Sequence, residues 1–178
     1  MKPPICDRLR NIEVLVLDVD GVLTTGEVIY SDTGEELQRF HVHDGAGLAL
    51  WHRAGKKSAI ITGRGSAALE RRAAELGVNP VMMKIRDKGA AIDDLLKKIN
   101  VTPDQVAIVA DDVPDLPMIR QASICFAVAD ARPDVIAAAD VTTLARGGRG
   151  AVRDAVECLL KSQGHWDDLI QGVVKAVN

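Results

Sequence analysis

Residues 13–24 read EVLVLDVDGVLT, and this stretch decides the fold. Its segment 14–17 is a continuous apolar run, typical of a strand in a sheet that helices cover on both faces. Asp18 and Asp20 follow, and side chains two positions apart on an extended chain point the same way. Gly21 then allows a sharp turn of the backbone. We therefore expect two carboxylates to converge at the carboxyl edge of a parallel sheet, where α/β proteins bind ligands.

Two carboxylates this close repel each other unless a cation lies between them or one holds a proton. Both arrangements suit phosphoryl transfer, in which one carboxylate attacks phosphorus and a protonated carboxyl gives its proton to the leaving oxygen. The alternative is an ordinary acidic turn, because Asp and Gly are common turn residues. The longer pattern Asp-x-Asp-Gly-x-x-Thr after a wholly apolar strand favours the chemical interpretation.

The composition is that of a soluble globular protein. The 178 residues are 47% hydrophobic and 26% charged, which predicts a single domain over residues 1–178. A net charge of −3, no basic stretch and 3% aromatic residues argue against nucleic acid as a partner. We find no run long enough to cross a bilayer and no signal peptide, so no membrane is expected. Three cysteines without metal-ligand spacing indicate reduced thiols in a cytoplasmic protein.

The rest of the core, residues 12–163, alternates helices and strands, while residues 1–12 are expected to be a polar lead-in. Further strands are expected at 58–61, 81–83, 106–109, 124–128 and 141–142. Helices are expected at 46–54, 66–76, 87–99, 133–139 and 151–160, with another that holds Pro117 in its first turn. This alternation predicts an α/β fold in which a parallel sheet lies between two layers of helices.

Two segments fall outside this alternation. In residues 28–40, two extended segments flank a turn that contains Gly34, which predicts a β-hairpin. Because a two-stranded ribbon is barely stable alone, it should lie against its own domain or another subunit. Residues 164–178 predict a tail helix with one apolar face, formed by Trp166, Leu169, Ile170, Val173, Val174 and Val177. Docking of this face on its own domain and docking on a neighbouring subunit both remain open.

Two further stretches at the same sheet edge can meet an anion. Thr62, Gly63 and Arg64 follow the strand 58–61, and a hydroxyl with backbone N–H groups near a helix start forms an anion site. The alternative for Thr62 is a simple helix cap. Lys88 opens the helix at 87–99, where its ammonium can offset carboxylates and bind phosphate, although a lone lysine is usually solvated surface.

Three more acids follow the strand 106–109, at Asp111, Asp112 and Asp115. So many carboxylates at one edge are costly unless a cation compensates them. Oxygen ligands and a phosphate substrate point to Mg²⁺. The alternative is a helix N-terminus whose acids suit the helix macrodipole. This alternative accounts for Asp115 more readily than for the adjacent Asp111 and Asp112.

Four stretches, taken in chain order, resemble the motifs of the haloacid dehalogenase (HAD) superfamily: residues 18–24, Thr62, Lys88, and Asp111 and Asp112 with Asp115. Almost the whole chain resembles the 3-deoxy-D-manno-octulosonate 8-phosphate (KDO 8-phosphate) phosphatase family, with matching stretches at 21–24, 34–35, 44–45, 60–64, 75–77, 111–116 and 147–153. The resemblance implies a three-layer Rossmann-like fold with an inserted hairpin and no separate cap domain. It also implies a homotetramer in which a neighbouring subunit helps to cover each active site.

The resemblance implies a role for each site residue. Asp18 is the nucleophile that becomes aspartyl-phosphate, and Asp20 is the general acid and then the base. Mg²⁺ is held by Asp18, the backbone carbonyl of Asp20, and Asp111. Thr62 and Lys88 bind the transferring phosphoryl group, and Asp112 and Asp115 support the metal and Lys88. Gly63, Arg64 and Arg149 are the candidates for binding the substrate, because a guanidinium suits a sugar-acid carboxylate; both arginines are equally candidates for ion pairs between subunits.

The implied reaction is the hydrolysis of KDO 8-phosphate to KDO and phosphate. The chain departs from the family pattern at Thr25, at Met83 and Lys84, and at Ala110, and the changes near the substrate mouth leave the sugar acid open. A phosphatase of a sialic-acid-type 9-phosphate or of broader sugar phosphates is therefore an alternative. So is a catalytically silent assembly module, which the presence of every catalytic group opposes.

Overall fold

The computed structural model describes residues 3–175. Its central sheet has six strands in the order β5-β4-β1-β6-β7-β8, and every neighbouring pair is parallel. The strands are β1 (Val14–Leu17), β4 (Lys57–Ile61), β5 (Val81–Met82), β6 (Val106–Ala110), β7 (Ile124–Ala127) and β8 (Val141–Thr142). Val14 of β1 pairs with Lys57 on one side and Val106 on the other. The predicted parallel sheet is confirmed, with the Asp18 strand near its centre.

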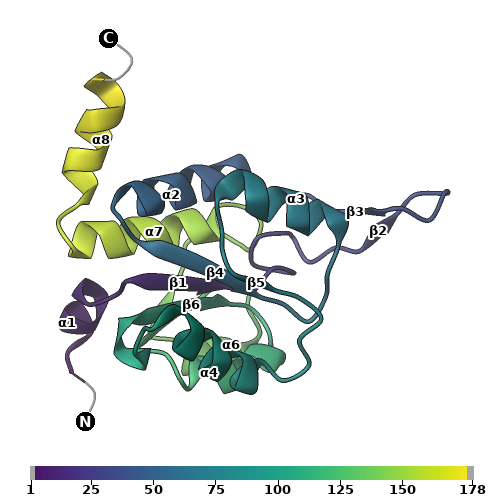
Figure 1. The fold of residues 1–178 in the computed structure, drawn as a ribbon, viewed down its shortest axis with the longest axis horizontal. Coiled ribbons are helices and arrows are strands. Elements are labelled where there is room, and N and C mark those ends of the chain that lie inside the picture. The colour runs from purple at the N-terminus through teal and green to yellow at the C-terminus, as the bar shows by residue number, and fades with distance from the viewer. Residues whose placement is uncertain (1–2, 176–178) are drawn as a thin grey trace.

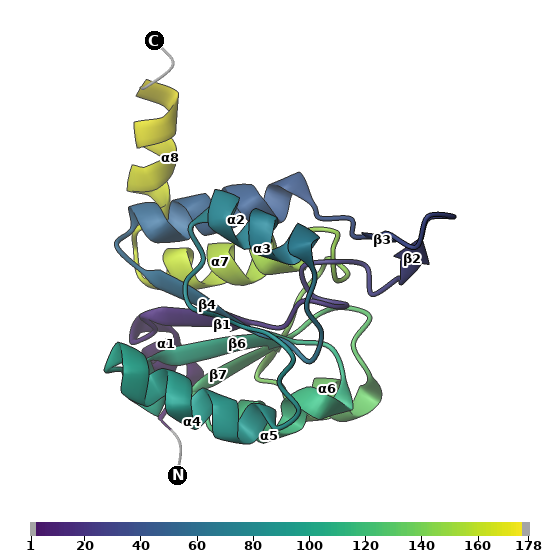
Figure 2. The same ribbon diagram turned by 45° about the vertical axis from the view of Figure 1, so that its right-hand side comes forward.

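Helices cover both faces of this sheet (Figures 1 and 2). One layer contains α2 (Val42–Arg53), α3 (Ala67–Leu76) and α7 (Ala151–Ser162). The other contains α4 (Lys88–Ile99), α5 (Leu116–Ile119) and α6 (Pro133–Ala138), with the 3₁₀ turns η1 (Pro103–Gln105) and η2 (Val113–Asp115) in the connections. All four residues of β1 are buried, because both faces of the strand are covered. The three-layer α/β fold is as predicted.

The chain starts differently from the expectation. Residues Ile5–Arg10 form the helix α1 where a polar lead-in was predicted, so that prediction was wrong. Leu9 of this helix is buried, and Arg8 donates to Asp140 at 2.7 Å. One apolar residue and one arginine anchor this helical turn, too few to form a visible periodic pattern. Helix α2 begins at Val42, before the expected residue 46, because the His41 side chain caps it by accepting from the His43 N–H.

The predicted hairpin is present but short. Strands β2 (Ile29–Tyr30) and β3 (Glu36–Leu37) pair in antiparallel fashion, and the hairpin extends away from the body of the molecule (Figure 1). A single bridge between Thr24 and Phe40 closes its base. Large apolar side chains on the ribbon are exposed, with Tyr30 at 64% and Leu37 at 51%.

The tail forms the helix α8 (Trp166–Lys175), which projects from the end of α7 (Figure 1). It contacts its own domain at Trp166, whose ring lies under the charged groups of Arg153 and Lys161 at 5.1 and 5.0 Å. Val173 and Val174 farther along the helix are exposed, and the predicted face member Val177 lies outside the described residues. Among the helices that the structure describes, none has the length and apolar character needed to span a membrane.

Candidate active site

One buried ammonium joins two carboxylates at the carboxyl edge of the sheet. Lys88 Nζ lies 2.7 Å from Asp18 Oδ1 and 2.5 Å from Asp115 Oδ1. All three side chains are buried, with Asp115 only 1% exposed. Lys88 is placed by the first turn of α4, which begins where the Asp87 carboxylate accepts from the Ala90 N–H at 3.0 Å. The predicted meeting of Lys88 with the acids of two strands is therefore present in the fold.

Both oxygens of Asp115 already have donors. While Oδ1 receives Lys88, Oδ2 accepts from the backbone N–H groups of Asp111 and Asp112 at 3.2 and 3.4 Å. The 3₁₀ turn η2 brings Asp115 back under the end of β6 and so makes these bonds possible. Asp115 therefore fixes both Lys88 and the backbone of the acidic loop.

Asp111 presents an oxygen that lacks a partner. Asp18, Asp111 and Asp115 each offer a carboxylate oxygen, and these atoms all lie within 4.8 Å of one another. Oδ1 of Asp111 is buried and has no hydrogen-bond partner in residues 3–175. Gly21, with φ +88°, brings the backbone over this carboxylate, because a Cβ there would lie 2.2 Å from Asp111 Oδ2. A buried acceptor without a donor, surrounded by other carboxylates, fits a hard cation such as Mg²⁺.

The pKa values express the same excess of negative charge. Burial, reinforced by Asp115 and opposed by Lys88, raises the pKa of Asp18 to about 6. Burial and then the charge of Asp18 raise the pKa of Asp111 to about 8. Burial lowers the pKa of Lys88, but the attraction of Asp18 and Asp115 outweighs it and the net shift is upward. At neutral pH the metal-free cluster thus keeps a proton on Asp111, which a divalent ion would displace.

Asp20 lies beside a different set of groups. Its Oδ2 is 3.6 Å from Arg64 Nε, and Arg64 Nη2 lies 2.8 Å from Glu36 Oε1 on β3. Burial raises the pKa of Asp20, and the charge of Arg64 opposes this shift. The two carboxylates of the opening motif therefore have separate surroundings, with Asp18 paired to Lys88 and Asp20 turned toward the hairpin.

Thr62 directly follows β4, as predicted, and is buried. Its Oγ1 accepts from the Arg64 N–H at 3.2 Å, whereas the cap of α3 is Ser66, whose Oγ accepts from the Leu69 N–H at 3.0 Å. The alternative in which Thr62 is a helix cap is therefore wrong. Gly63 and Arg64 are exposed at the same edge.

Two further predicted site residues, Asp112 and Arg149, lie at the surface. Asp112 is exposed, and its carboxylate accepts from the Val113 N–H at 2.7 Å to begin η2. Lys88 pairs with Asp115 and Asp18, and among residues 3–175 it forms no hydrogen bond or ion pair with Asp112. Arg149 is exposed on the loop before α7. The structure therefore gathers Asp18, Lys88, Asp111 and Asp115, and leaves these two residues outside that cluster.

Sequence reasoning assigned no role to Gly147 and Gly148, which pack against the turn that follows β1. A Cβ on Gly147 would lie 1.6 Å from the Gly21 carbonyl oxygen, and one on Gly148 would lie 2.3 Å from the Thr24 carbonyl carbon. The Gly148 N–H also donates to the Val22 carbonyl at 2.8 Å. The paired glycines let two backbones pack directly together, and their adjacency in the sequence was the available signal.

Buried Asp44 is a second group that was missed. It accepts from the Gly150 N–H at 3.3 Å and the Arg153 N–H at 3.0 Å, and so fixes the start of α7 behind the glycine loop. An acid among the apolar residues of α2 was the available signal, since a buried acid needs donors.

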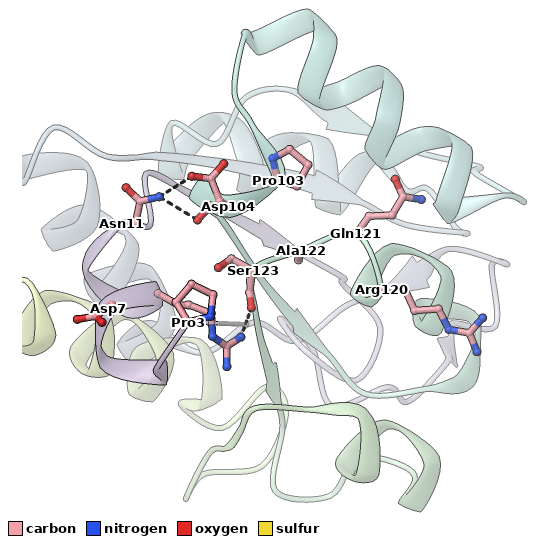
Figure 3. A pocket seen from close by; sticks show the side chains of 10 residues that line it. Pro3, Asp7, Asn11, Pro103, Asp104, Arg120, Gln121, Ala122 and Ser123 are labelled. Atoms are coloured by element: carbon pink, nitrogen blue, oxygen red, sulfur yellow. Dashed lines mark hydrogen bonds between the residues drawn. The ribbon is translucent and has the colours of Figure 1, made fainter. Parts of the chain in front are cut away.

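A hollow of about 720 Å³ lies at the opposite, amino edge of the sheet (Figure 3). Its lining comes from α1, η1 and the turn before β7: Pro3, Asp7, Arg8, Asn11, Pro103, Asp104, Arg120, Gln121, Ala122 and Ser123. Arg8 pairs with Asp140, and Asn11 Nδ2 donates to Asp104 Oδ2 at 2.7 Å. The hollow offers space but none of the buried carboxylate cluster, which lies at the carboxyl edge.

Comparison with known proteins agrees with this geometry. The model of the haloacid dehalogenase-like hydrolases matches residues 80–153. The 3-deoxy-D-manno-octulosonate 8-phosphate phosphatase KdsC of Escherichia coli K12 is 42% identical over 161 residues, which cover 90% of this chain and 86% of that protein. The chain belongs to the KDO 8-phosphate phosphatase family.

Other members of the KDO 8-phosphate phosphatase family match along almost their whole length. The enzyme of Haemophilus influenzae is 39% identical over 96% of both chains. A solved KDO 8-phosphate phosphatase of Moraxella catarrhalis, in complex with magnesium, phosphate and KDO, superposes with a TM-score of 0.92 at 37% identity and covers 95% of this chain and 97% of that one.

Proposed function

We propose that this protein is a Mg²⁺-dependent phosphatase that hydrolyses KDO 8-phosphate to KDO and phosphate. The observation that carries the proposal is the buried, unpartnered Oδ1 of Asp111 beside Asp18, at the edge where Lys88 enters. Membership of the family supports the substrate, and the M. catarrhalis complex supports the metal.

We assign the metal to Asp18, Asp111 and the backbone carbonyl of Asp20. Asp115 is left out of this set, because Lys88 and two backbone N–H groups already use its oxygens. Bound there, Mg²⁺ supplies positive charge that offsets the carboxylates and the phosphoryl oxygens. Its few protein ligands suit an ion that keeps several waters.

The chain's own residues then act in two steps. In the first, the Asp18 carboxylate attacks phosphorus, the bond from phosphorus to the sugar oxygen breaks, and Asp20 gives its proton to that oxygen. In the second, Asp20, now a carboxylate, takes a proton from a water whose oxygen attacks phosphorus, and the bond to Asp18 breaks. Phosphate leaves, Asp18 is regenerated and Asp20 is protonated again.

We assign the phosphoryl oxygens to Thr62 and Lys88. Lys88 is held in place by Asp115 and the start of α4, so its ammonium needs little reorganisation during the reaction. Asp112 supports the site by capping the turn that returns Asp115 to the cluster. Catalysis in this proposal is mostly positioning and electrostatics, as in other phosphoryl transfers.

We assign the sugar acid to the exposed mouth formed by Gly63, Arg64 and Arg149. An arginine suits a carboxylate, and Arg64 is already placed between two acids. Lys84 is exposed near this mouth, and its N–H donates to the Arg64 carbonyl at 3.1 Å. This basic surface favours an anionic sugar over a neutral one.

We also propose a homotetramer in which hairpins meet and a neighbouring subunit covers each site. The support is the exposed apolar surface of the hairpin, formed by Val28, Tyr30 and Leu37, on a ribbon too short to be stable alone. Light scattering after size exclusion at micromolar protein tests this assembly, and a monomer would contradict it. A cytoplasmic location and a single catalytic domain over residues 1–178 complete the proposal.

The test is phosphate release from the purified protein across a panel of sugar-acid and neutral sugar phosphates. We expect the highest kcat/KM for KDO 8-phosphate with Mg²⁺ present, and loss of activity in EDTA. A higher kcat/KM for a sialic-acid-type 9-phosphate would move the assignment to that substrate. Full turnover without metal, or no turnover of any member together with no binding of trifluoroberyllate, would overturn the proposal.

A further inference from the structure

Lys84 has an unusual backbone conformation. Its φ is +58°, in the left-handed region that favours glycine. Among the described residues other than glycine, only Asn100 shares a positive φ, and it caps the end of α4, where asparagine is common. Lys84 lies in the loop between β5 and α4 and caps no helix. A lysine in this conformation destabilises the fold relative to glycine, and strain of this kind gathers at functional sites.

The loop of Lys84 is fixed against the loop that follows β4. The Lys84 N–H donates to the Arg64 carbonyl at 3.1 Å, and the Ile85 N–H donates to the Thr62 carbonyl at 3.0 Å. The stem of Lys84 starts over Gly65, since a Cβ on Gly65 would lie 3.6 Å from Lys84 Cγ. The two loops therefore hold an exposed lysine at the mouth of the site, beside the residue assigned to the phosphoryl group.

The charge of Lys84 is not compensated within the described part of the chain. Lys88 is paired with two acids, and Arg64 lies between Asp20 and Glu36, at 3.6 and 2.8 Å. Lys84 has no ion pair with any of residues 3–175. Of these three cations, Lys84 is thus the one that an anion can meet without competing with an acid of this range.

The proposed substrate carries a second anionic group. A keto-sugar acid 8-phosphate has its phosphate at one end of the carbon chain and its carboxylate at the other. With the phosphoryl group on Thr62 and Lys88, the carboxylate lies farther out, toward the mouth. An ammonium at the mouth attracts a sugar acid by its charge and gives a neutral sugar no such advantage.

We propose that Lys84 is a specificity-determining residue that attracts the carboxylate of the sugar acid. This inference rests on the proposed phosphatase function and names the group by which the enzyme selects an anionic sugar. Lys84 transfers no proton and forms no covalent bond, so its effect is on substrate binding. The strain at its backbone is the cost of placing a cation where glycine would fit better.

The experiment compares two substitutions of Lys84 on a matched pair of substrates. Lys84→Met removes the charge but keeps the strain, and Lys84→Gly removes both. The substrates are the sugar-acid phosphate with the highest turnover and its methyl ester, which lacks the carboxylate charge. If the ester is not turned over, its inhibition constant replaces kcat/KM. At low salt we expect kcat/KM of both variants to fall about 5-fold or more for the acid, and less than about 2-fold for the ester.

The loss should have the signature of a charge contact made on binding. We expect it mainly in KM, with kcat nearly unchanged, because the carboxylate lies far from the reacting bond and is held equally in the ground and transition states. In wild type, added KCl should reduce the preference for the acid over the ester, since salt screens exposed charges. The two variants should show little of this salt dependence.

Thermal unfolding separates this role from a structural one. Lys84→Gly should raise the Tm by about 1–3 °C, because glycine adopts the positive φ without strain, and Lys84→Met should leave the Tm unchanged. A variant that is more stable but less selective does not owe its loss to a damaged fold. Lys98→Met, at an exposed lysine of α4, is the matched control and should keep the wild-type kcat/KM and Tm.

Each other outcome counts against the inference. Equal losses for the acid and its ester would show an effect unrelated to the carboxylate, and an unchanged kcat/KM for the acid would show that Lys84 does not meet it. A Tm of Lys84→Gly at or below that of wild type would show that the position is not strained, and would overturn the inference as well. None of these results touches the proposed phosphatase, which would fail instead if wild type released no phosphate from any substrate.

Discussion

The two edges of the central sheet differ in how their charges balance. At the amino edge the hollow in Figure 3 is roomy; Arg8 Nε has no hydrogen-bond partner in residues 3–175, but the charge of Arg8 is matched by Asp140, and Asp104 accepts from Asn11. At the carboxyl edge three acids lie together, the ammonium of Lys88 pairs with two of them, and Oδ1 of the third, Asp111, has no donor in residues 3–175. Uncompensated buried charge therefore marks the functional edge, and open volume alone does not.

The difference also has a thermodynamic meaning. Buried carboxylates that lack partners raise the free energy of the folded state, and a protein keeps such a cluster when a ligand compensates it. The amino edge is stable as it stands, whereas the carboxyl edge is completed by a cation and a phosphate. Substitutions made at one edge at a time therefore test this difference.

The largest effect is expected for Asp18→Asn. This near-isosteric change removes the nucleophile, so phosphate release should fall by about 10³-fold or more while the fold persists. Asp93→Asn, an exposed acid of α4, serves as the matched control and should keep wild-type activity. If Asp18→Asn kept an activity within about 10-fold of wild type, the aspartyl-phosphate route would be ruled out.

The next effect is that of Lys88→Met. Removing the ammonium leaves Asp18 and Asp115 buried without their shared partner, and the free energy of unfolding should fall by about 3–5 kcal/mol. Urea unfolding without metal measures this loss. Mg²⁺ should restore part of the stability, because it offsets the same charge, but phosphate release should stay at least about 10²-fold below wild type. Unchanged stability would contradict the charge balance described here.

The stability of the metal-free protein should depend on pH. The pKa of Asp111 in the fold is about 8, above its ordinary value, so the folded state binds more protons than the unfolded chain between these values. Stability should therefore decrease as the pH rises from 3.8 toward 8 and level off above it, and Asp18, whose pKa is about 6, adds to the fall below pH 6. The Tm measured in EDTA should show this slope. Saturating Mg²⁺ should flatten it, and a slope of the opposite sign would refute the assignment.

The smallest effect on activity is expected at the amino edge. Arg8→Met breaks the pair with Asp140 and the bond to the Ser123 carbonyl, and it should lower the free energy of unfolding by about 2 kcal/mol. The loss is smaller than for Lys88→Met because Asp140 keeps the Cys125 N–H as a donor. The kcat/KM with Mg²⁺ should be unchanged, and a loss beyond 10-fold would show that the two edges are coupled, against the additivity expected of distant sites.

Much of the carboxyl edge could be predicted because strand order makes it unavoidable. The apolar run 14–17 and the run before Asp111 are buried strands, and neighbouring parallel strands end at one edge. Taken by itself, Lys88 was ambiguous in the sequence, because a lone lysine is usually solvated surface. Its position became clear only from a contact with Asp18 across 70 residues, which no local pattern encodes.

The remaining features depend on packing that the sequence does not display. Asp112 and Asp115 look alike in a list of acids, yet the turn η2 exposes one and buries the other. Gly147 is understood only once the Gly21 carbonyl is seen against it. Gln38 accepts from the Ser66 hydroxyl at 2.6 Å, and a polar residue in a short exposed ribbon gives no sign of that bond.

Calorimetric titration of Mg²⁺ into the metal-free protein at pH 7 tests the central claim most directly. We predict one bound ion per chain, with proton release that appears as a dependence of the heat on the buffer, because the ion displaces the proton of Asp111. Asp111→Asn should lose this binding, whereas Asp112→Asn should retain it. Wild-type binding without proton release, or equal binding by Asp111→Asn, would contradict the claim that the uncompensated oxygen of Asp111 makes this edge the active site.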